Sequence, residues 1–185
     1  MKTTLAALRL LVALTLLTGL AYPLAVWALG RAFFRDAAEG SLLHRDGKLV
    51  GSALLAQKTT DARYFSPRPS AGDYATVASG ASNQSWTNAK LRAAIDERRA
   101  AYAPASDVPA DLLTASGGGL DPEISADAAR FQLPRVAAAR HFDATQRARL
   151  EKIVADSVEG GGLTPARVNV LQLNLAVDAA FPASR

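Results

Sequence analysis

One apolar stretch near the N-terminus constrains this chain more than any other feature. Residues 10–29 carry no charged side chain, and arginines stand on either side of them, at Arg9 and Arg31. About 20 residues with a rise of roughly 1.5 Å each span about 30 Å, the thickness of the hydrocarbon core of a bilayer. Backbone polar groups inside lipid must be bonded within the segment, so the stretch predicts a transmembrane helix.

Three residues inside the stretch are informative about that helix. Tyr22 and Trp27 lie toward its C-terminal end, where amphipathic rings favour the level of the lipid headgroups. Pro23 stands between them and predicts a kink, which membrane helices tolerate better than soluble helices do.

A cleaved secretory signal peptide is the alternative interpretation of the same segment. Lys2 and Arg9 form a short positive region, and residues 28–30 would serve as a small-residue cleavage site. The apolar core of a signal peptide is normally about 7 to 15 residues long, and this one is longer. We therefore expect an uncleaved, single-pass anchor in the inner membrane.

The flanking charges leave the orientation of the anchor open. Lys2 and Arg9 precede the apolar residues and Arg31 and Arg35 follow them, so the positive-inside count is balanced. A short N-terminus in front of a large domain favours a cytoplasmic N-terminus. The domain is then expected on the periplasmic side.

Charge and cysteine content exclude several classes of function. The 21 basic and 17 acidic residues give a net charge of +4, and no basic cluster with interleaved aromatic residues is present, which argues against a nucleic-acid partner. The absence of cysteine excludes disulfides and thiolate metal sites. His44 and His141 are far apart in sequence and neither has a second ligand three or four residues later, so we expect surface or structural histidines and no metal site.

The sequence contains no motif of a self-contained enzyme. A phosphate-binding Gly-x-x-x-x-Gly-Lys loop, a Gly-x-Ser-x-Gly elbow and a His-Glu-x-x-His pair are all absent, so we expect no catalytic residue. About 145 residues follow the anchor region, enough for one domain with a modest core. The predicted organisation is a short N-terminal segment at 1–9, a transmembrane helix at 10–30, a membrane-proximal connector at 31–45 and one soluble domain at 46–185.

Short strands and a long loop are predicted in the first part of that domain. Residues 48–57 follow an Asp46-Gly47 turn dipeptide and predict a strand. Residues 63–66 suggest a second short strand, which ends at the prolines that follow it. Residues 70–88 are rich in Ser, Ala, Gly, Thr and Asn, a composition typical of a long ordered loop.

Capping residues predict the helices of the second part. The expected helices are 89–102 after Asn88, 126–141 after Ser125 with Pro134 expected to kink or break it, and 144–159 after Asp143 with Gln146 as capping-box partner. Residues 168–178 fit either a helix capped by Asn169, which we slightly favour, or a strand. The fold class expected is α+β: a single N-terminal transmembrane helix followed by one compact, helix-rich soluble domain with a few short strands.

Many short blocks, in one order along the chain, resemble a known family. The chain is similar to the C subunit of the Kdp potassium-transporting ATPase, the small single-span partner of a P-type pump. It departs from the usual family residues at Ala81 (commonly Gly), Gly118 (commonly Ser) and Glu123 (commonly His). The matching blocks include Gly51-Ser52, Tyr64-Phe65, Arg68-Pro69-Ser70-Ala71, Ser79-Gly80, Ser82-Asn83, Val108-Pro-Ala-Asp-Leu-Leu-Thr-Ala-Ser116, Gly119-Leu-Asp-Pro122, Ile124-Ser125, Gln132, Arg135-Val-Ala137 and Arg167-Val-Asn-Val-Leu171.

The resemblance implies a non-catalytic subunit of a complex that imports potassium at the expense of ATP. Its expected partners are the membrane, the potassium-conducting subunit and the ATP-hydrolysing subunit, which supply the ion filter and the phosphorylated site. The subunit is expected to support assembly and activity and to hold no cofactor tightly, with ATP reached only through the complex. The alternative role is that of a catalytic chaperone that raises the ATP affinity of the hydrolysing subunit through a transient nucleotide-containing complex.

The resemblance also points to a first candidate loop, which contacts either a nucleotide or a partner. In the family this segment has been likened to the signature loop of ABC transporters. Backbone amides and hydroxyls in such a loop can cradle phosphate. The loop has no Lys or Arg to meet the phosphate charge, and Ala78 stands where that motif would begin with leucine, so a structural or partner-contacting loop is favoured. Its residues are Ser79, Gly80, Ser82, Asn83 and Gln84.

A second candidate loop would contact a partner or line an ion path. Its carboxylates and hydroxyls are suited to gathering cations. The simpler interpretation, which we favour, is that Asp121 shapes a turn and Ser125 caps a helix. The residues of this loop are Asp111, Thr114, Ser116, Gly119, Asp121 and Ser125.

Overall fold

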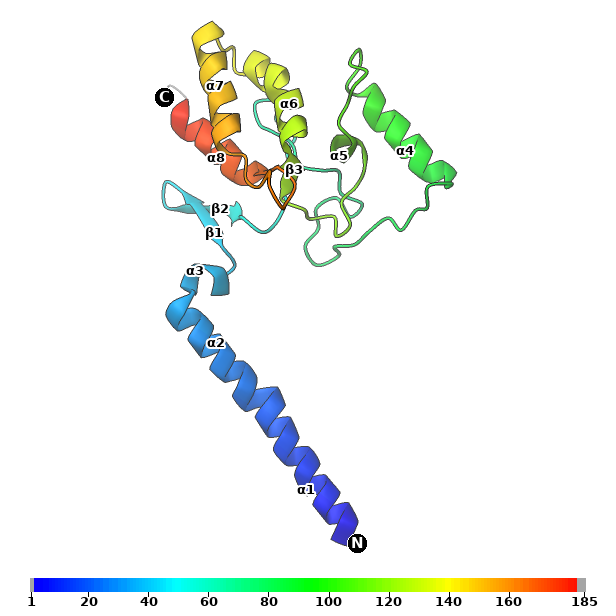
Figure 1. The fold of residues 1–185 in the computed structure, drawn as a ribbon, viewed down its shortest axis with the longest axis vertical. Coiled ribbons are helices and arrows are strands. Elements are labelled where there is room, and N and C mark those ends of the chain that lie inside the picture. The colour runs from blue at the N-terminus through cyan, green and yellow to red at the C-terminus, as the bar shows by residue number, and fades with distance from the viewer. Residues whose placement is uncertain (1, 183–185) are drawn as a thin grey trace. The chain divides into compact units, whose positions relative to one another are not determined.

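The chain divides into two compact units, which are described separately here. The computed structural model describes residues 2–182. The first unit runs to Leu42 and the second begins at Leu43. Figure 1 draws the first unit in blue and the second in cyan to red.

The first unit is dominated by one long apolar helix with three parts, α1 (Lys2–Leu16), η1 (Leu17–Ala21) and α2 (Tyr22–Phe33). Together they form a helix of 32 residues with a mean hydropathy of 1.9 in its most apolar window, none of which is buried within the chain. Among the described residues it is the one helix long and apolar enough to cross a membrane. This is consistent with single-pass anchoring.

A π-helical turn, η1, lies immediately before Pro23. Proline has no N–H, so Pro23 cannot donate to the carbonyl of Gly19 four residues earlier. In η1 the N–H of Tyr22 donates to the carbonyl of Leu17, five residues earlier. Such a wider turn gives the backbone carbonyls before Pro23 other N–H partners, although proline itself has no N–H to donate. The helix therefore passes Pro23 without a break, with a π-helical turn before it.

A charged turn follows the apolar helix. The short helix α3 (Arg35–Ala38) is followed by its C-cap residue, Glu39. The Glu39 carboxylate lies 2.7 Å from Arg31 Nη2 and 3.2 Å from Arg35 Nε. The hydrogen bond from Arg35, helped by the charge of Arg31, lowers the pKa of Glu39.

A β-hairpin comes next, formed by β1 (Leu42–Arg45) and β2 (Lys48–Ser52). The predicted turn is confirmed: Asp46 and Gly47 have φ values of 52° and 74°, as a two-residue type I′ turn requires. β2 is shorter than predicted because the Ser52 hydroxyl accepts a hydrogen bond from the Leu54 N–H at 3.0 Å and turns the chain. β1 was not predicted, since its residues are mostly exposed and show no apolar alternation.

The core of the second unit lies between a small sheet and three helices. The strands β3 (Glu123–Ser125) and β4 (Arg167–Asn169) pair antiparallel, with buried Ile124 opposite buried Val168. α6 (Ala126–Ala139), α7 (Ala144–Asp156) and α8 (Val170–Ala180) pack beside them, as Figure 1 shows. The largest fully buried side chains include Phe65, Leu112, Ile124, Leu150 and Leu173.

The predicted helix starts are confirmed. Asn88 caps α4 (Ala89–Ala100), Ser125 caps α6, Asn169 caps α8, and Asp143 with Gln146 forms a full capping box before α7. Residues 170–180 are therefore helical, which decides between the two alternatives for that segment. α6 continues through Pro134 and ends at Ala139. A further short helix, α5 (Ala110–Leu113), precedes β3.

The strand predicted at residues 63–66 is wrong. The segment begins in a turn, in which the Tyr64 N–H donates to the Asp61 carbonyl at 3.1 Å, and it pairs with no strand, because side-chain amides bond its backbone instead. Asn174 bonds both the N–H and the carbonyl of Phe65, and Gln132 bonds both groups of Ser66. The fold class itself is confirmed: a long apolar helix followed by a helix-rich domain with two small two-stranded sheets.

Candidate functional site

The first candidate loop lies on the surface of the second unit. Residues 79–83 are exposed, and the side chains of Ser79, Ser82, Asn83 and Gln84 make no hydrogen bond within residues 2–182. Two large apolar side chains stand beside the loop, Val77 with a relative exposure of 102% and Trp86 with 87%. No charged residue occurs from 74 to 88. The segment is therefore an uncharged, partly apolar surface.

The helix that follows this loop has its N-terminus occupied. The Asn88 side chain accepts a hydrogen bond from the Lys90 N–H at 2.8 Å, which satisfies one of the free amides of α4. Residues 79–84 stand outside this first turn.

The structure brings the two candidate loops together at one point. Gly119 has a φ of +73°, and a Cβ placed on it would lie 3.0 Å from Ser70 Oγ and 3.1 Å from the carbonyl oxygen of Gly80. Only glycine fits this position comfortably, because an L-residue would be strained there and would also crowd both neighbours. Gly119 therefore allows the backbone of the first loop, at Gly80, to pack closely against the second loop.

Three residues of the second loop, Asp111, Asp121 and Ser125, line one groove of about 810 Å³. Asp111 holds Ser125: its carboxylate accepts the Ser125 N–H at 2.7 Å and the Ser125 hydroxyl at 3.2 Å. The Ser125 oxygen in turn accepts the Ala128 N–H at 3.0 Å, which is the predicted helix cap. Asp111 thus orients the residue that starts α6.

Asp121 has the turn-shaping contacts expected of it. One of its oxygens accepts the Glu123 N–H at 3.0 Å, and the other lies 3.2 Å from Arg68 Nη1. Glu123 is itself 2.9 Å from Arg167. Arginines therefore balance two of the carboxylates in this groove.

Thr114 and Ser116 stay outside the groove. The Thr114 hydroxyl donates to the carbonyl of Ala110 at 2.8 Å, and Ser116 is buried, with its N–H donating to Pro69 O at 3.1 Å. Within residues 2–182 no group of three or more His, Cys, Asp or Glu side chains is placed to hold a metal ion.

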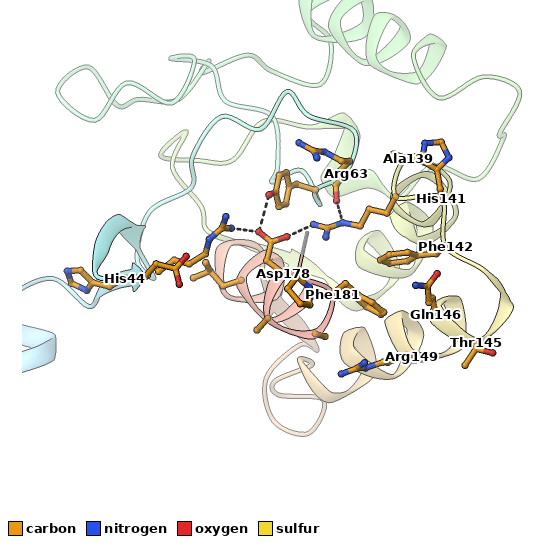
Figure 2. Close-up of a pocket in the computed structure, with 18 residues that line it drawn as sticks. His44, Arg63, Ala139, His141, Phe142, Thr145, Gln146, Arg149, Asp178 and Phe181 are labelled. Carbon is orange, nitrogen blue, oxygen red and sulfur yellow. Dashed lines mark hydrogen bonds and ion pairs between the residues drawn. The ribbon is translucent and has the colours of Figure 1, made fainter. Parts of the chain in front are cut away.

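A second, larger hollow was not predicted at all. It measures about 1390 Å³ and is lined by segments far apart in the chain, around residues 44–46, 63–64, 139–149 and 175–182 (Figure 2). Both histidines of the chain, His44 and His141, line it, and both are exposed. No single stretch of sequence carries a signal for this site, because each segment contributes only a few residues.

Asp178 is the centre of the polar contacts in this hollow. Its carboxylate accepts hydrogen bonds from Arg45, from Arg140 at 2.7 Å and from the Tyr64 hydroxyl at 3.0 Å, and Figure 2 shows these contacts converging on it. Arg140 also donates to the carbonyl of Arg63 at 2.8 Å. The cluster ties the hairpin, the 63–65 segment and the end of α6 to α8.

Comparisons with known proteins agree on one family. The family model KdpC, described as K+-transporting ATPase, c chain, matches residues 4–179. A potassium-transporting ATPase KdpC subunit from Mycobacterium bovis is 49% identical over 180 residues, covering 93% of this chain and 95% of that protein. The KdpC subunits of Leptospira interrogans and Rhodospirillum rubrum are 47% and 48% identical, covering 95% and 98% of this chain and 93% and 98% of their own lengths.

Proposed function

This chain belongs to the KdpC family, and from that membership we propose that it supports the assembly and activity of the Kdp potassium-transporting ATPase through contacts of its exposed loop with the other Kdp subunits. It is an accessory, non-catalytic subunit of that complex.

The observation that carries the proposal is the uncharged surface at residues 74–88. Val77 and Trp86 are almost fully exposed there, and the side chains of Ser79, Ser82, Asn83 and Gln84 make no hydrogen bond within residues 2–182, so they can bond a partner. Tryptophan is among the residues that contribute most to binding energy at protein interfaces. Charged residues are depleted at the centres of such interfaces, as they are in this segment. We therefore assign the loop of Ser79, Gly80, Ser82, Asn83 and Gln84 to a contact with a partner subunit.

The apolar helix has a matching role in the membrane. None of its most apolar window is covered by the rest of the chain, so lipid or helices of other subunits must cover it. Thr15, Thr18 and Gly19 are small enough to allow close helix approach, and the Thr18 hydroxyl is already satisfied by the Leu14 carbonyl at 2.7 Å. We propose a single-pass anchor in the inner membrane with a cytoplasmic N-terminus and a periplasmic domain.

The second candidate is the catalytic chaperone. Its support is the run of exposed hydroxyls and amides at residues 79–84, which has the composition of a phosphate-binding loop. Against it stand the absence of any cationic side chain from 74 to 88 and the use of an α4 amide by Asn88. An ion-path role for Asp111 and Asp121 is weaker still, since both carboxylates are engaged within the chain.

Protease accessibility in intact spheroplasts tests the orientation. We expect cleavage of the domain by protease added from outside, because the proposal places it in the periplasm. Protection until the membrane is permeabilised would overturn that placement. Cleavage from outside would exclude direct binding of cytoplasmic ATP by this domain.

Variants of the loop test the contact itself. We expect Trp86→Ala and Val77→Ala to weaken co-purification with the other Kdp subunits and to lower potassium-stimulated ATPase activity, with no loss of stability in the isolated subunit. Leu163→Ala is the matched control, because Leu163 is equally exposed, at 107%, on a different loop. If Ser79, Ser82 and Gln84 variants raise the KM for ATP while the complex stays intact, the chaperone role is favoured instead.

A further inference from the structure

Among the arginines that line the larger hollow, Arg149 is the one that pairs with no carboxylate of the described residues. Arg45 and Arg140 share Asp178, and Arg63 pairs with Asp61 at 2.7 Å. Arg149 also lines the hollow, is exposed, and forms no ion pair with any carboxylate of residues 2–182. Its positive charge is therefore available to a ligand.

An apolar floor lies directly beneath this charge. The rings of Phe142 and Phe181 are 4.3 Å apart between centroids, and the Arg149 guanidinium stands 5.2 Å above the Phe181 ring. Figure 2 shows Phe142, Phe181 and Arg149 on the same side of the hollow. A guanidinium held over a ring keeps its N–H groups free for a carboxylate.

The lining as a whole carries more arginines than carboxylates, and Asp46 adds one exposed negative charge at the hairpin turn. Asp46 and Asp178 are the two carboxylates among the lining residues, and Asp178 is already shared by two arginines. Thr145, His44 and His141 add exposed polar groups. The surface thus complements a ligand that carries a negative charge next to an apolar group.

We propose that this hollow receives an acidic segment of another Kdp subunit, with a carboxylate on Arg149 and an apolar side chain against the partly exposed ring of Phe181, which buried Phe142 supports from below. The hollow, about 1390 Å³ in volume, is large enough for a short peptide segment. Arginine pairs with carboxylates through two parallel hydrogen bonds, which fixes the orientation of the segment. The inference rests on the proposed role in assembly and adds a second contact, separate from the 74–88 loop.

Charge reversal in the complete complex tests the ion pair. Arg149→Glu is expected to make the complex dissociate at several-fold lower salt concentration, because repulsion replaces a charge-assisted contact at the hollow. Lys152→Glu, the same charge change on an exposed position of α7 outside the lining, is expected to leave the dissociation midpoint unchanged. Arg149→Lys is expected to fall between the parent and Arg149→Glu. Equal salt tolerance of Arg149→Glu and Lys152→Glu would overturn the proposal.

Photo-crosslinking identifies the occupant. A benzophenone amino acid at Thr145, on the rim of the hollow, is expected to crosslink to a segment of another Kdp subunit that contains Asp or Glu, and the adduct is expected to disappear with Arg149→Glu. An adduct with lipid, an adduct with residues 183–185 of the same chain, or no adduct would overturn the proposal. If Trp86→Ala disrupts the complex while Arg149→Glu leaves it unchanged, the loop contact stands and the acidic-segment contact falls.

Discussion

The side-chain amide of Asn174 makes both backbone hydrogen bonds of Phe65. Its Oδ1 accepts the Phe65 N–H at 2.8 Å and its Nδ2 donates to the Phe65 carbonyl at 2.9 Å. Phe65 is fully buried, so an amide on α8 allows this residue to enter the core without a strand beside it. Asn174, more than a hundred residues away, thus helps to position the segment, together with Gln132, which bonds both backbone groups of Ser66.

Removing this amide tests how much it contributes. Asn174→Ala leaves a buried donor and a buried acceptor of Phe65 unsatisfied, and each costs about 1–3 kcal/mol, so we expect a loss of about 2–6 kcal/mol in the free energy of unfolding. Gln172→Ala, an exposed position on the same helix, should change it by less than about 0.5 kcal/mol. Urea unfolding of the full-length subunit in detergent, followed by circular dichroism, measures both. Equal stability of the two variants would contradict the role of Asn174.

Two adjacent glycines give a paired test of the contact between the candidate loops. Gly119→Ala forces a side chain into a left-handed φ and against Gly80 and Ser70, which should cost about 1–2 kcal/mol and loosen the 74–88 loop. Gly118→Ala meets no atom within 4 Å and should be neutral. Chymotrypsin cleavage at Trp86 should be faster in the first variant only. Unchanged cleavage in Gly119→Ala would show that the conformation of the loop does not depend on the close contact between Gly80 and Gly119.

The Asp178 cluster is expected to respond unequally to its two arginines. Asp178→Ala leaves the Arg140 guanidinium, whose side chain is only 9% exposed, without its counter-charge, and should cost about 3 kcal/mol in unfolding free energy. Arg45→Ala removes a side chain that is 50% exposed and screened by solvent, so it should cost much less. Thermal unfolding of both variants in detergent compares them. A larger loss for Arg45→Ala would reverse this assignment.

Asp61 gives the stability of the domain a dependence on acid pH. Hydrogen bonds from the side chain and the backbone N–H of Arg63 lower the pKa of the Asp61 carboxyl from 3.8 to about 2. A lowered pKa in the folded state means that the stabilisation is complete above the unfolded value and is lost as the pH falls through the folded value. Asp61→Asn should therefore be less stable than the parent near neutral pH, and this difference should close between pH 4 and pH 2. A difference that stays constant over that range would contradict the shift.

Features that depend on neighbouring residues, such as helix caps, were predicted from the sequence. Contacts between residues far apart in the chain were not. Asn88, Ser125, Asp143 and Asn169 were identified as caps because a helix start depends on residues within one turn. Residues 63–66 were wrongly predicted as a strand because the partners of Phe65 and Ser66 are side chains of two distant helices, which no local pattern identifies.

In the candidate sites too, the contacts between residues far apart in the chain could not be predicted from the sequence. The pairing of Asp111 with Ser125 and the contact of Gly80 with Gly119 join residues that the sequence placed in candidate loops, but neither contact follows from their spacing. The Asp178 hollow was missed, since Tyr64 and Arg45 approach it from 114 and 133 positions away. A charged residue at the end of an apolar helix, as Asp178 is in α8, was the one local hint.

The π-helical turn η1 changes how the anchor can be recognised. It holds one residue more per hydrogen-bonded ring than an α-helical turn, which rotates everything after it by about 100° relative to an unbroken α-helix. A row of side chains that runs along one side of α1 is therefore out of phase with the row that continues it in α2. The row of side chains in α1 and the row in α2 therefore face different directions around the helix axis. A straight neighbouring helix can pack against one of these rows but not against both.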